Sequence, residues 1–152
     1  MTEALRRKAA IVGIGATAFS ANSGCSEQRL AAEAVLAALE DAGLGPDDVD
    51  GIVNSDFDAT NQIDVINTVG LRNIGSYAMI PHGGGSPCGT VAQAAMMVAS
   101  GASRCVVAYR SLNERSGHRY GSSEAIPTFP WVYGLHAPYG LIVPAEWTAM
   151  HA

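Results

Sequence analysis

The chain has few charged residues, few aromatic residues and no long hydrophobic run. Of its 152 residues, 15% are charged and 7% aromatic, whereas 48% are hydrophobic. Lys and Arg number 9 against 14 Asp and Glu, and the formal net charge of -5 argues against a nucleic-acid partner. No apolar stretch approaches the roughly 20 residues that cross a bilayer, and no signal-type hydrophobic region follows Met1 to Lys8. We therefore expect a core-rich cytoplasmic protein without a membrane span.

Cysteine is scarce as well. The three cysteines, Cys25, Cys88 and Cys105, are an odd number and lack the spacing of metal ligands. This pattern argues against both a disulfide framework and a zinc site. We expect no metal, and at most one cysteine with a chemical role.

What the sequence does contain is a regular alternation of apolar runs and helical patterns. Short apolar runs predict buried parallel strands at residues 8–15, 51–54, 76–80 and 104–109. Helical spacing with capping residues predicts helices over 27–42, 62–69 and 145–152. Because strands and helices of this length alternate, we expect right-handed crossovers and an α/β fold with a mainly parallel sheet.

The stretch from His82 to Gly101 stands out within this alternation. Three glycines, residues 83–85, permit positive φ and close backbone approach, and the helix behind them is rich in Ala, Met and Val and has no charge. We expect this helix to be buried all round, with its first N–H groups inside the protein. Such a helix end suits an anion, an oxyanion or a thiolate. Cys88 near this end is either a nucleophile or a buried small residue.

The character of the chain changes at Ser111. Residues 111–138 are polar and rich in Gly, Pro and aromatic side chains, and they begin at the C-terminal end of a predicted strand. Open α/β sheets bind ligands at that end of their strands, and long loops inside a domain are usually functional. A solvated charged loop is the competing interpretation.

Several segments taken together resemble the lipid-transfer-protein branch of the thiolase superfamily. The most specific is Asn113-Glu114-Arg115-Ser116-Gly117 with Tyr109-Arg110 upstream of it; the others are residues 9–17, 26–44, 50–52 and the glycine turn with its helix. The resemblance runs through essentially the whole chain. It is strongest to the actinobacterial steroid side-chain-cleaving aldolases, which are relatives of the sterol carrier protein-x thiolase.

The resemblance implies a five-layered αβαβα fold built from two similar halves, of which this sequence corresponds to the N-terminal half. Residues 1–110 would form the thiolase-like N-terminal core, and residues 111–152 the start of the loop region with an incomplete helix. The C-terminal half is absent. In thiolases a nucleophilic cysteine stands at the head of the buried central helix, while a second cysteine and histidines come from the C-terminal half.

The position of Cys88 does not match that nucleophile. Counting back from Gly101 places the thiolase cysteine near Gly84, and aligning the motif glycine with Gly89 places it at Ser86. Thioester acyl transfer is then disfavoured, but the helix end can still polarise a carbonyl through backbone hydrogen bonds. The residues predicted to bind substrate are His82, Gly84, Gly85, Ser86 and Arg115.

The resulting expectation is retro-aldol cleavage of a β-hydroxyacyl-CoA thioester of a steroid side chain, releasing a ketosteroid and a short acyl-CoA. The aldolase acid/base tyrosines lie in the absent half, so Tyr109, Tyr120 and Tyr139 are not assigned that role. One alternative is a thiolase, an acyl-CoA acyltransferase using Cys88. Another is a non-catalytic lipid-binding or partner subunit.

The resemblance also implies cofactors and partners. No tightly bound cofactor is expected, since coenzyme A enters as part of the acyl-CoA substrate. A homodimer formed through the sheet is expected, together with a small acyl-CoA-binding partner protein that has an oligonucleotide-binding-type fold.

Overall fold

The computed structural model describes residues 6–81, 85–115, 134–141 and 144–150. The chain divides into two compact units, Met1–Asn113 and Glu114–Ala152. The second unit contains the short 3-10 helix η4, Ala137–Tyr139, and the helix α6, Pro144–Ala149. Pro144 opens α6 as the sequence predicts, because its fixed φ suits the first turn of a helix.

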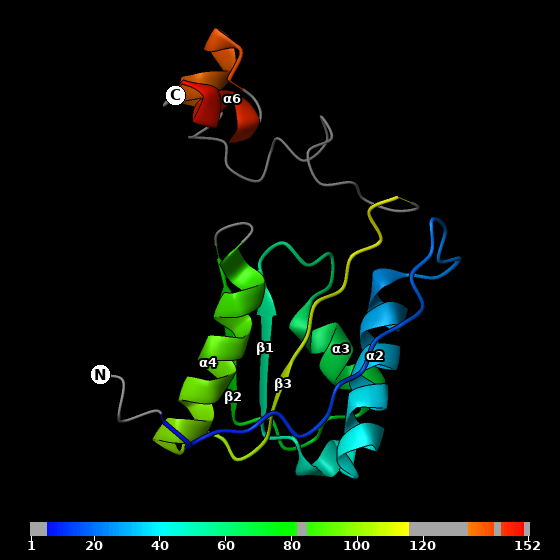
Figure 1. The fold of residues 1–152 in the computed structure, drawn as a ribbon. Coiled ribbons are helices and arrows are strands. Elements are labelled where there is room, and N and C mark those ends of the chain that lie inside the picture. The colour runs from blue at the N-terminus through cyan, green and yellow to red at the C-terminus, as the bar shows by residue number, and fades with distance from the viewer. Residues whose placement is uncertain (1–5, 82–84, 116–133, 142–143, 151–152) are drawn as a thin grey trace. The chain divides into compact units, whose positions relative to one another are not determined.

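A parallel three-stranded sheet forms the centre of the first unit (Figure 1). Its strands are β1, Gly51–Ser55, β2, Ser76–Ile80, and β3, Val106–Ala108, in the order β2-β1-β3. Both neighbours run parallel to β1. The predicted α/β class with a mainly parallel sheet is confirmed.

Strand β3 is shorter than the 104–109 run predicted from the sequence. The Asp50 carboxylate accepts the backbone N–H groups of Arg104 and Cys105, each at 2.9 Å. Those amides are therefore used by a side chain, and the ladder begins only at Val106, which pairs with Gly51.

The helices beside the sheet begin and end where their capping residues predict. Helix α2, Glu27–Ala42, has Ser26 as N-cap accepting from the Arg29 amide and Gly43 as C-cap at φ 66. Helix α3, Gln62–Val69, is capped by Asn61 and closed by a glycine with φ 82. A side-chain acceptor at the first turn and a left-handed residue at the last satisfy otherwise unpaired backbone groups. The short 3-10 helix η1, Pro46–Asp48, connects α2 to β1.

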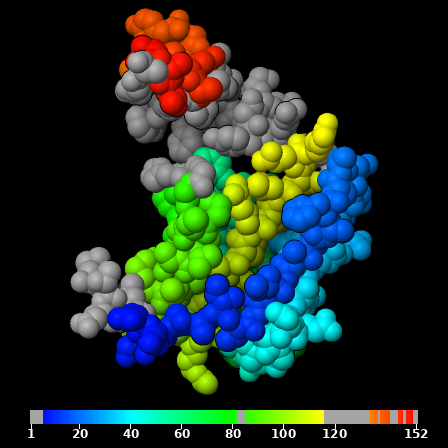
Figure 2. Space-filling model, viewed as in Figure 1, coloured from blue at the N-terminus to red at the C-terminus, as the bar shows by residue number. Residues whose placement is uncertain are grey.

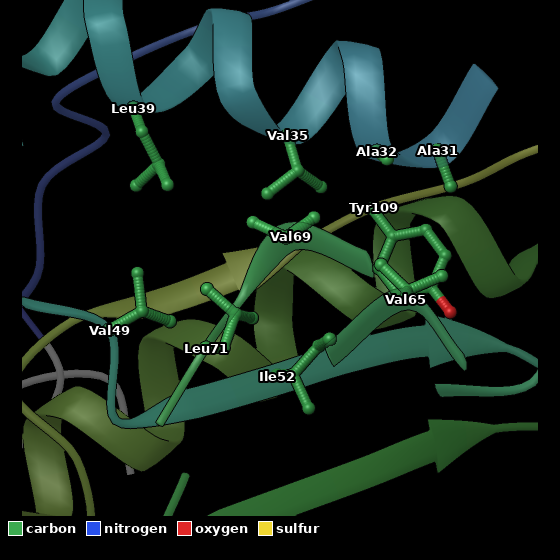
Figure 3. Packing of buried hydrophobic residues seen from close by; sticks show 10 residues of the cluster. All are labelled: Ala31, Ala32, Val35, Leu39, Val49, Ile52, Val65, Val69, Leu71 and Tyr109. Atoms are coloured by element: carbon green, nitrogen blue, oxygen red, sulfur yellow. The ribbon is translucent and has the colours of Figure 1, made fainter. Parts of the chain in front are cut away.

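The hydrophobic core lies between these two helices and β1. Figure 3 shows the α2 side chains directed toward α3 and the sheet, with Ile52 beneath them. Ile52, Val49 and Val65 have no exposed surface. The buried cluster comprises Ala31, Ala32, Val35, Leu39, Val49, Ile52, Val65, Val69, Leu71 and Tyr109.

The prediction of a first strand at residues 8–15 is wrong in this structure. The segment forms no strand, and Ile11, Val12 and Ile14 are 74%, 63% and 76% exposed. It follows α2 instead: the Ile14 amide donates to Asp41 Oδ2 at 2.9 Å, and a Cβ on Gly13 would overlap the Ala38 carbonyl oxygen. Figure 2 shows this blue segment on the outer surface. An apolar run predicts a strand only where a neighbouring strand accepts its hydrogen bonds, and this segment is paired with none of the described strands.

The central helix also differs from expectation. Helix α4, Ser86–Ser100, packs on all three strands, but only Ser86, Thr90 and Met97 are buried. Val91 and Met96 are 49% and 42% exposed, so the predicted burial on every side is wrong for this chain. The sheet covers one side of α4, and no second layer among the described residues covers the other. No helix in the described part of the chain has the length and apolarity needed to cross a membrane.

Candidate functional site at the head of helix α4

The head of α4 lies at the C-terminal edge of the sheet, where parallel α/β sheets place their ligands. Strand β1 ends at Ser55 and α4 begins at Ser86, and their hydroxyl oxygens are 2.7 Å apart. Both residues are only 1% exposed. The hydroxyl of Ser86, a residue predicted to contact substrate, is therefore hydrogen-bonded to Ser55 at the end of β1. This pair fixes the head of α4 to the central strand.

The first turn of α4 begins at a glycine. Gly85 is its N-cap, exposed and at φ -81, and among the described residues no side-chain cap is recorded for this helix end. The backbone of a helix N-terminus carries partial positive charge and suits a developing oxyanion. This arrangement is chemically able to hold a thioester or enolate oxygen. The predicted residues His82 and Gly84 lie outside the described residues.

Cys88 is exposed on the first turn of α4. The neighbouring Gly89 packs against Ile80 of β2, where an added Cβ would lie 2.8 Å from the Ile80 Cγ2 atom. Glycine thus permits close helix–sheet contact at this position, while the cysteine before it points to the surface of this chain. The expectation that Cys88 is a buried small residue is therefore wrong for this chain, and its role as a nucleophile stays an alternative prediction.

The other two cysteines are half-buried. Cys105 packs against the hydrophobic core, and its thiol pKa is raised by burial and, less strongly, by Asp50 and Asp48. A raised pKa keeps the thiol protonated and unreactive at neutral pH. Cys105 therefore has a structural role beside the core.

A carboxylate that the sequence did not single out joins two strand ends. The Asp58 side chain is 0% exposed; Oδ2 accepts the Ser55 amide at 2.9 Å and Oδ1 accepts the Ser111 amide at 3.1 Å. The Arg110 Nε lies 3.7 Å from the same Oδ1. Burial raises the Asp58 pKa, while the two amides, Arg110 and the Asn54 side chain oppose the increase. Asp58 therefore connects the end of β1 to the segment that follows β3.

That segment is the start of the motif that carried the family resemblance, and its polar side chains are anchored. Ser111 Oγ donates to the Glu27 carbonyl at 2.5 Å, and Asn113 Nδ2 donates to the Cys25 carbonyl at 2.9 Å. Ser23 Oγ donates to Asn113 Oδ1 at 3.0 Å. The motif is therefore held at the start of α2. Arg115, predicted to contact substrate, is exposed and belongs to the second unit.

The α3 side of β1 carries further buried polar groups. Gln62 Nε2 donates to Asn54 Oδ1 and to the Ala78 carbonyl, both at 2.7 Å. Tyr109 is 6% exposed, with its hydroxyl 3.4 Å from Thr60 Oγ1, and burial is the largest cause of its raised pKa. These side chains stabilise the strand end. The sequence signal for them was the run of polar residues directly after a buried strand.

A shallow cavity of about 460 Å³ lies away from this network, where residues 17–25 pass the start of α2. Arg29 and Glu33 on its wall pair with each other at 2.7 Å, and their side chains are 68% and 47% exposed. None of the residues predicted to bind substrate lines this cavity in the described part of the chain. No group of three or more His, Cys, Asp or Glu among the described residues could hold a metal ion.

Comparison with known proteins identifies clear relatives. The chain is 50% identical over 149 residues to a steroid side-chain-cleaving aldolase of Thermomonospora curvata, covering 95% of this chain and 38% of that protein. It is 48% identical over 153 residues to the 17-hydroxy-3-oxo-4-pregnene-20-carboxyl-CoA lyase of Mycobacterium tuberculosis, covering 97% and 40% respectively. The solved structure of an Ltp2-ChsH2(DUF35) aldolase matches 93% of this chain and 36% of that chain, with a TM-score of 0.79 at 48% identity.

These relatives confirm the resemblance to steroid side-chain-cleaving aldolases that the sequence motifs predicted. The chain spans about two fifths of the length of the curated relatives it matches. No protein-family model matches it.

Proposed function

We propose that this chain, as a homologue of steroid side-chain-cleaving aldolases, forms part of a carbon–carbon lyase that acts on a steroid CoA thioester. The substrate is a steroid whose side chain ends in a β-hydroxyacyl-CoA thioester. The products are a ketosteroid and a short acyl-CoA. The observation that carries the proposal is the 50% and 48% identity to proteins named for this chemistry, extending over nearly the whole chain.

The reaction needs a base and an electrophilic donor. The base removes the β-hydroxyl proton, the bond between the α and β carbons breaks, and the electron pair passes to the α carbon as an enolate of the acyl-CoA. Protonation of that carbon completes the balance. The head of α4, which begins at Gly85, is suited to stabilise the enolate oxygen through backbone N–H groups. The acid and base are expected in the part of the relatives that this chain does not span.

The assembly follows from the same relationship. One homologous structure is named as an Ltp2-ChsH2(DUF35) aldolase. By analogy, we propose that this chain works with a small acyl-CoA-binding subunit of oligonucleotide-binding-type fold, and as a homodimer. No tightly bound cofactor is proposed beyond the coenzyme A of the substrate, and we propose a cytoplasmic location.

The test is turnover by the complete gene product with its partner subunit. Incubation with 17-hydroxy-3-oxo-4-pregnene-20-carboxyl-CoA, the compound in the name of one relative, should yield a ketosteroid and an acyl-CoA without added free coenzyme A. A thiolase would instead consume free coenzyme A and depend on its nucleophile. The Cys88→Ser variant should therefore keep its activity. The absence of a ketone product, or loss of turnover in Cys88→Ser, would contradict the proposal.

A further inference from the structure

We infer that Asp58 is a positioning residue of this lyase, one that holds the head of α4 and the motif segment 110–113 in fixed relative positions. The inference rests on the proposed function, because the helix head is the group proposed to stabilise the enolate. It concerns contacts within the first unit only.

The contacts of Asp58 form a continuous chain between the two elements. Its Oδ2 holds the Ser55 amide at 2.9 Å, and the Ser55 hydroxyl pairs with Ser86 Oγ on the first turn of α4 at 2.7 Å. Its Oδ1 holds the Ser111 amide at 3.1 Å. The Ser111 hydroxyl continues to the Glu27 carbonyl at the start of α2. One carboxylate thus connects the central strand, the site helix and the motif.

A carboxylate is the group this position requires. Both amides are donors, and a carboxylate accepts through each of its two oxygens. An amide of the same shape offers one acceptor oxygen, so its NH₂ would face one of the two backbone N–H groups. Arg110, 3.7 Å from Oδ1, supplies the compensating charge. Burying a carboxylate is costly, and apolar packing often stabilises such a site equally well. The charge at this position therefore serves to fix geometry more than to add stability.

The hydrogen bonds next to Asp58 are buried, so a small shift of one group disturbs the others. Ser55 and Ser86 are each 1% exposed, so the hydroxyl pair that joins β1 to α4 is closed to solvent. Buried polar networks lose much of their value when one member moves. Displacement of a catalytic donor by about 1 Å can cost about a hundredfold in rate.

The experiment compares Asp58→Asn with Asp64→Asn in the complete gene product. Asp64 is an exposed residue of α3, so the same chemical change is made outside the network. We expect Asp58→Asn to lower kcat by about tenfold to hundredfold with a smaller change in KM, because a misplaced helix head affects the transition state most. Asp64→Asn should match the wild type. Equal kinetics for the two variants would overturn the inference.

Amide hydrogen exchange supplies a readout independent of turnover. In Asp58→Asn, exchange at Ser55 and Ser111 should accelerate, while the Val53 amide inside β1 keeps its protection. Unchanged exchange at Ser55 and Ser111 would contradict the positioning role. A wild-type protein without turnover would overturn the proposed function, and the exchange data would still show whether Asp58 holds the two segments.

A second variant keeps the test decisive if Asp58→Asn does not fold. Ser55→Ala retains its amide for Asp58 but removes the hydroxyl bound to Ser86. We expect it to lower kcat as well, with exchange at Ser111 unchanged. Where both single variants fold, their effects should be less than additive in the double variant, because they interrupt one chain of contacts. Wild-type kcat in Ser55→Ala, or full additivity, would count against the inference.

Discussion

The two faces of the sheet are packed in different ways. On one face, α2 and α3 bury a cluster of ten residues against β1, and Ile52 and Val65 have no exposed surface. On the other face, α4 has no charged residue, yet of its apolar side chains only Met97 is buried. Val91 and Met96 remain 49% and 42% exposed.

The hydrophobic core that stabilises this chain lies on the α2/α3 face, whereas the candidate functional site lies on the α4 face. The α2/α3 face follows the ordinary amphipathic rule, with apolar residues inward and charged residues outward. Helix α4 does not follow this rule: it carries more apolar side chains than its contacts with the described residues bury. On the sheet itself, Tyr77 and Met79 of β2 are 76% and 54% exposed. Exposed apolar surface of this kind is typical of regions that bind another protein or a ligand.

The largest effect is expected in the core of the α2/α3 face. Ile52→Ala removes a side chain with 0% exposure and should lower the free energy of unfolding by about 2–5 kcal/mol. Ile63→Ala makes the same change at a position 57% exposed and should alter it by less than about 0.5 kcal/mol. Urea unfolding of the complete gene product measures both. Similar losses of unfolding free energy in the two variants would contradict the expected difference between buried and exposed positions.

An intermediate effect is expected on self-association of the 152-residue chain expressed alone. Its uncovered apolar surface should cause concentration-dependent association, visible by sedimentation velocity. Met96→Lys on α4 should reduce this association, whereas Leu36→Lys, at an equally exposed position on α2, should reduce it less. A sharp monomeric melting transition of the unmodified chain at high concentration would contradict the prediction.

The smallest effect concerns pH and Asp58. Burial raises the pKa of Asp58 above its ordinary value of 3.8, so the folded state binds this proton more tightly than the unfolded chain. The stabilising contribution is fully present below that value and is lost as pH rises through the folded pKa. The unfolding free energy of the wild type minus that of Asp58→Asn should therefore fall with rising pH across this window. Urea midpoints at a series of pH values test this, and a constant difference would contradict it.

The sequence anticipated the local elements well because their signals are local. Ser26, Asn61, Gly43 and Gly70 cap the helices where the residue types predict, since capping depends on neighbouring backbone groups. The central helix was also found, and the aldolase resemblance is confirmed by relatives at about half identity.

Asp58 illustrates what residue types did not reveal. It stands in a turn of polar residues, where a solvated side chain is the ordinary expectation. Asp58 can join the two strand ends only because the pairing of β3 with β1 brings Ser111, 53 positions away in the chain, close to Ser55. Likewise, the residue type of Ser86 does not show that its hydroxyl pairs with Ser55, 31 positions earlier in the chain.

Residue types alone thus predict the ends of α2 and α3, the parallel α/β class and the relationship to steroid side-chain-cleaving aldolases. Three features appear only in the folded chain: residues 8–15 follow α2 without strand partners among the described residues, α4 stays partly exposed, and Asp58 joins two strand ends. The physical reason is the range of the interactions. Caps and periodicity act within a few residues, whereas burial, strand pairing and buried polar contacts depend on partners that only the folded chain brings together.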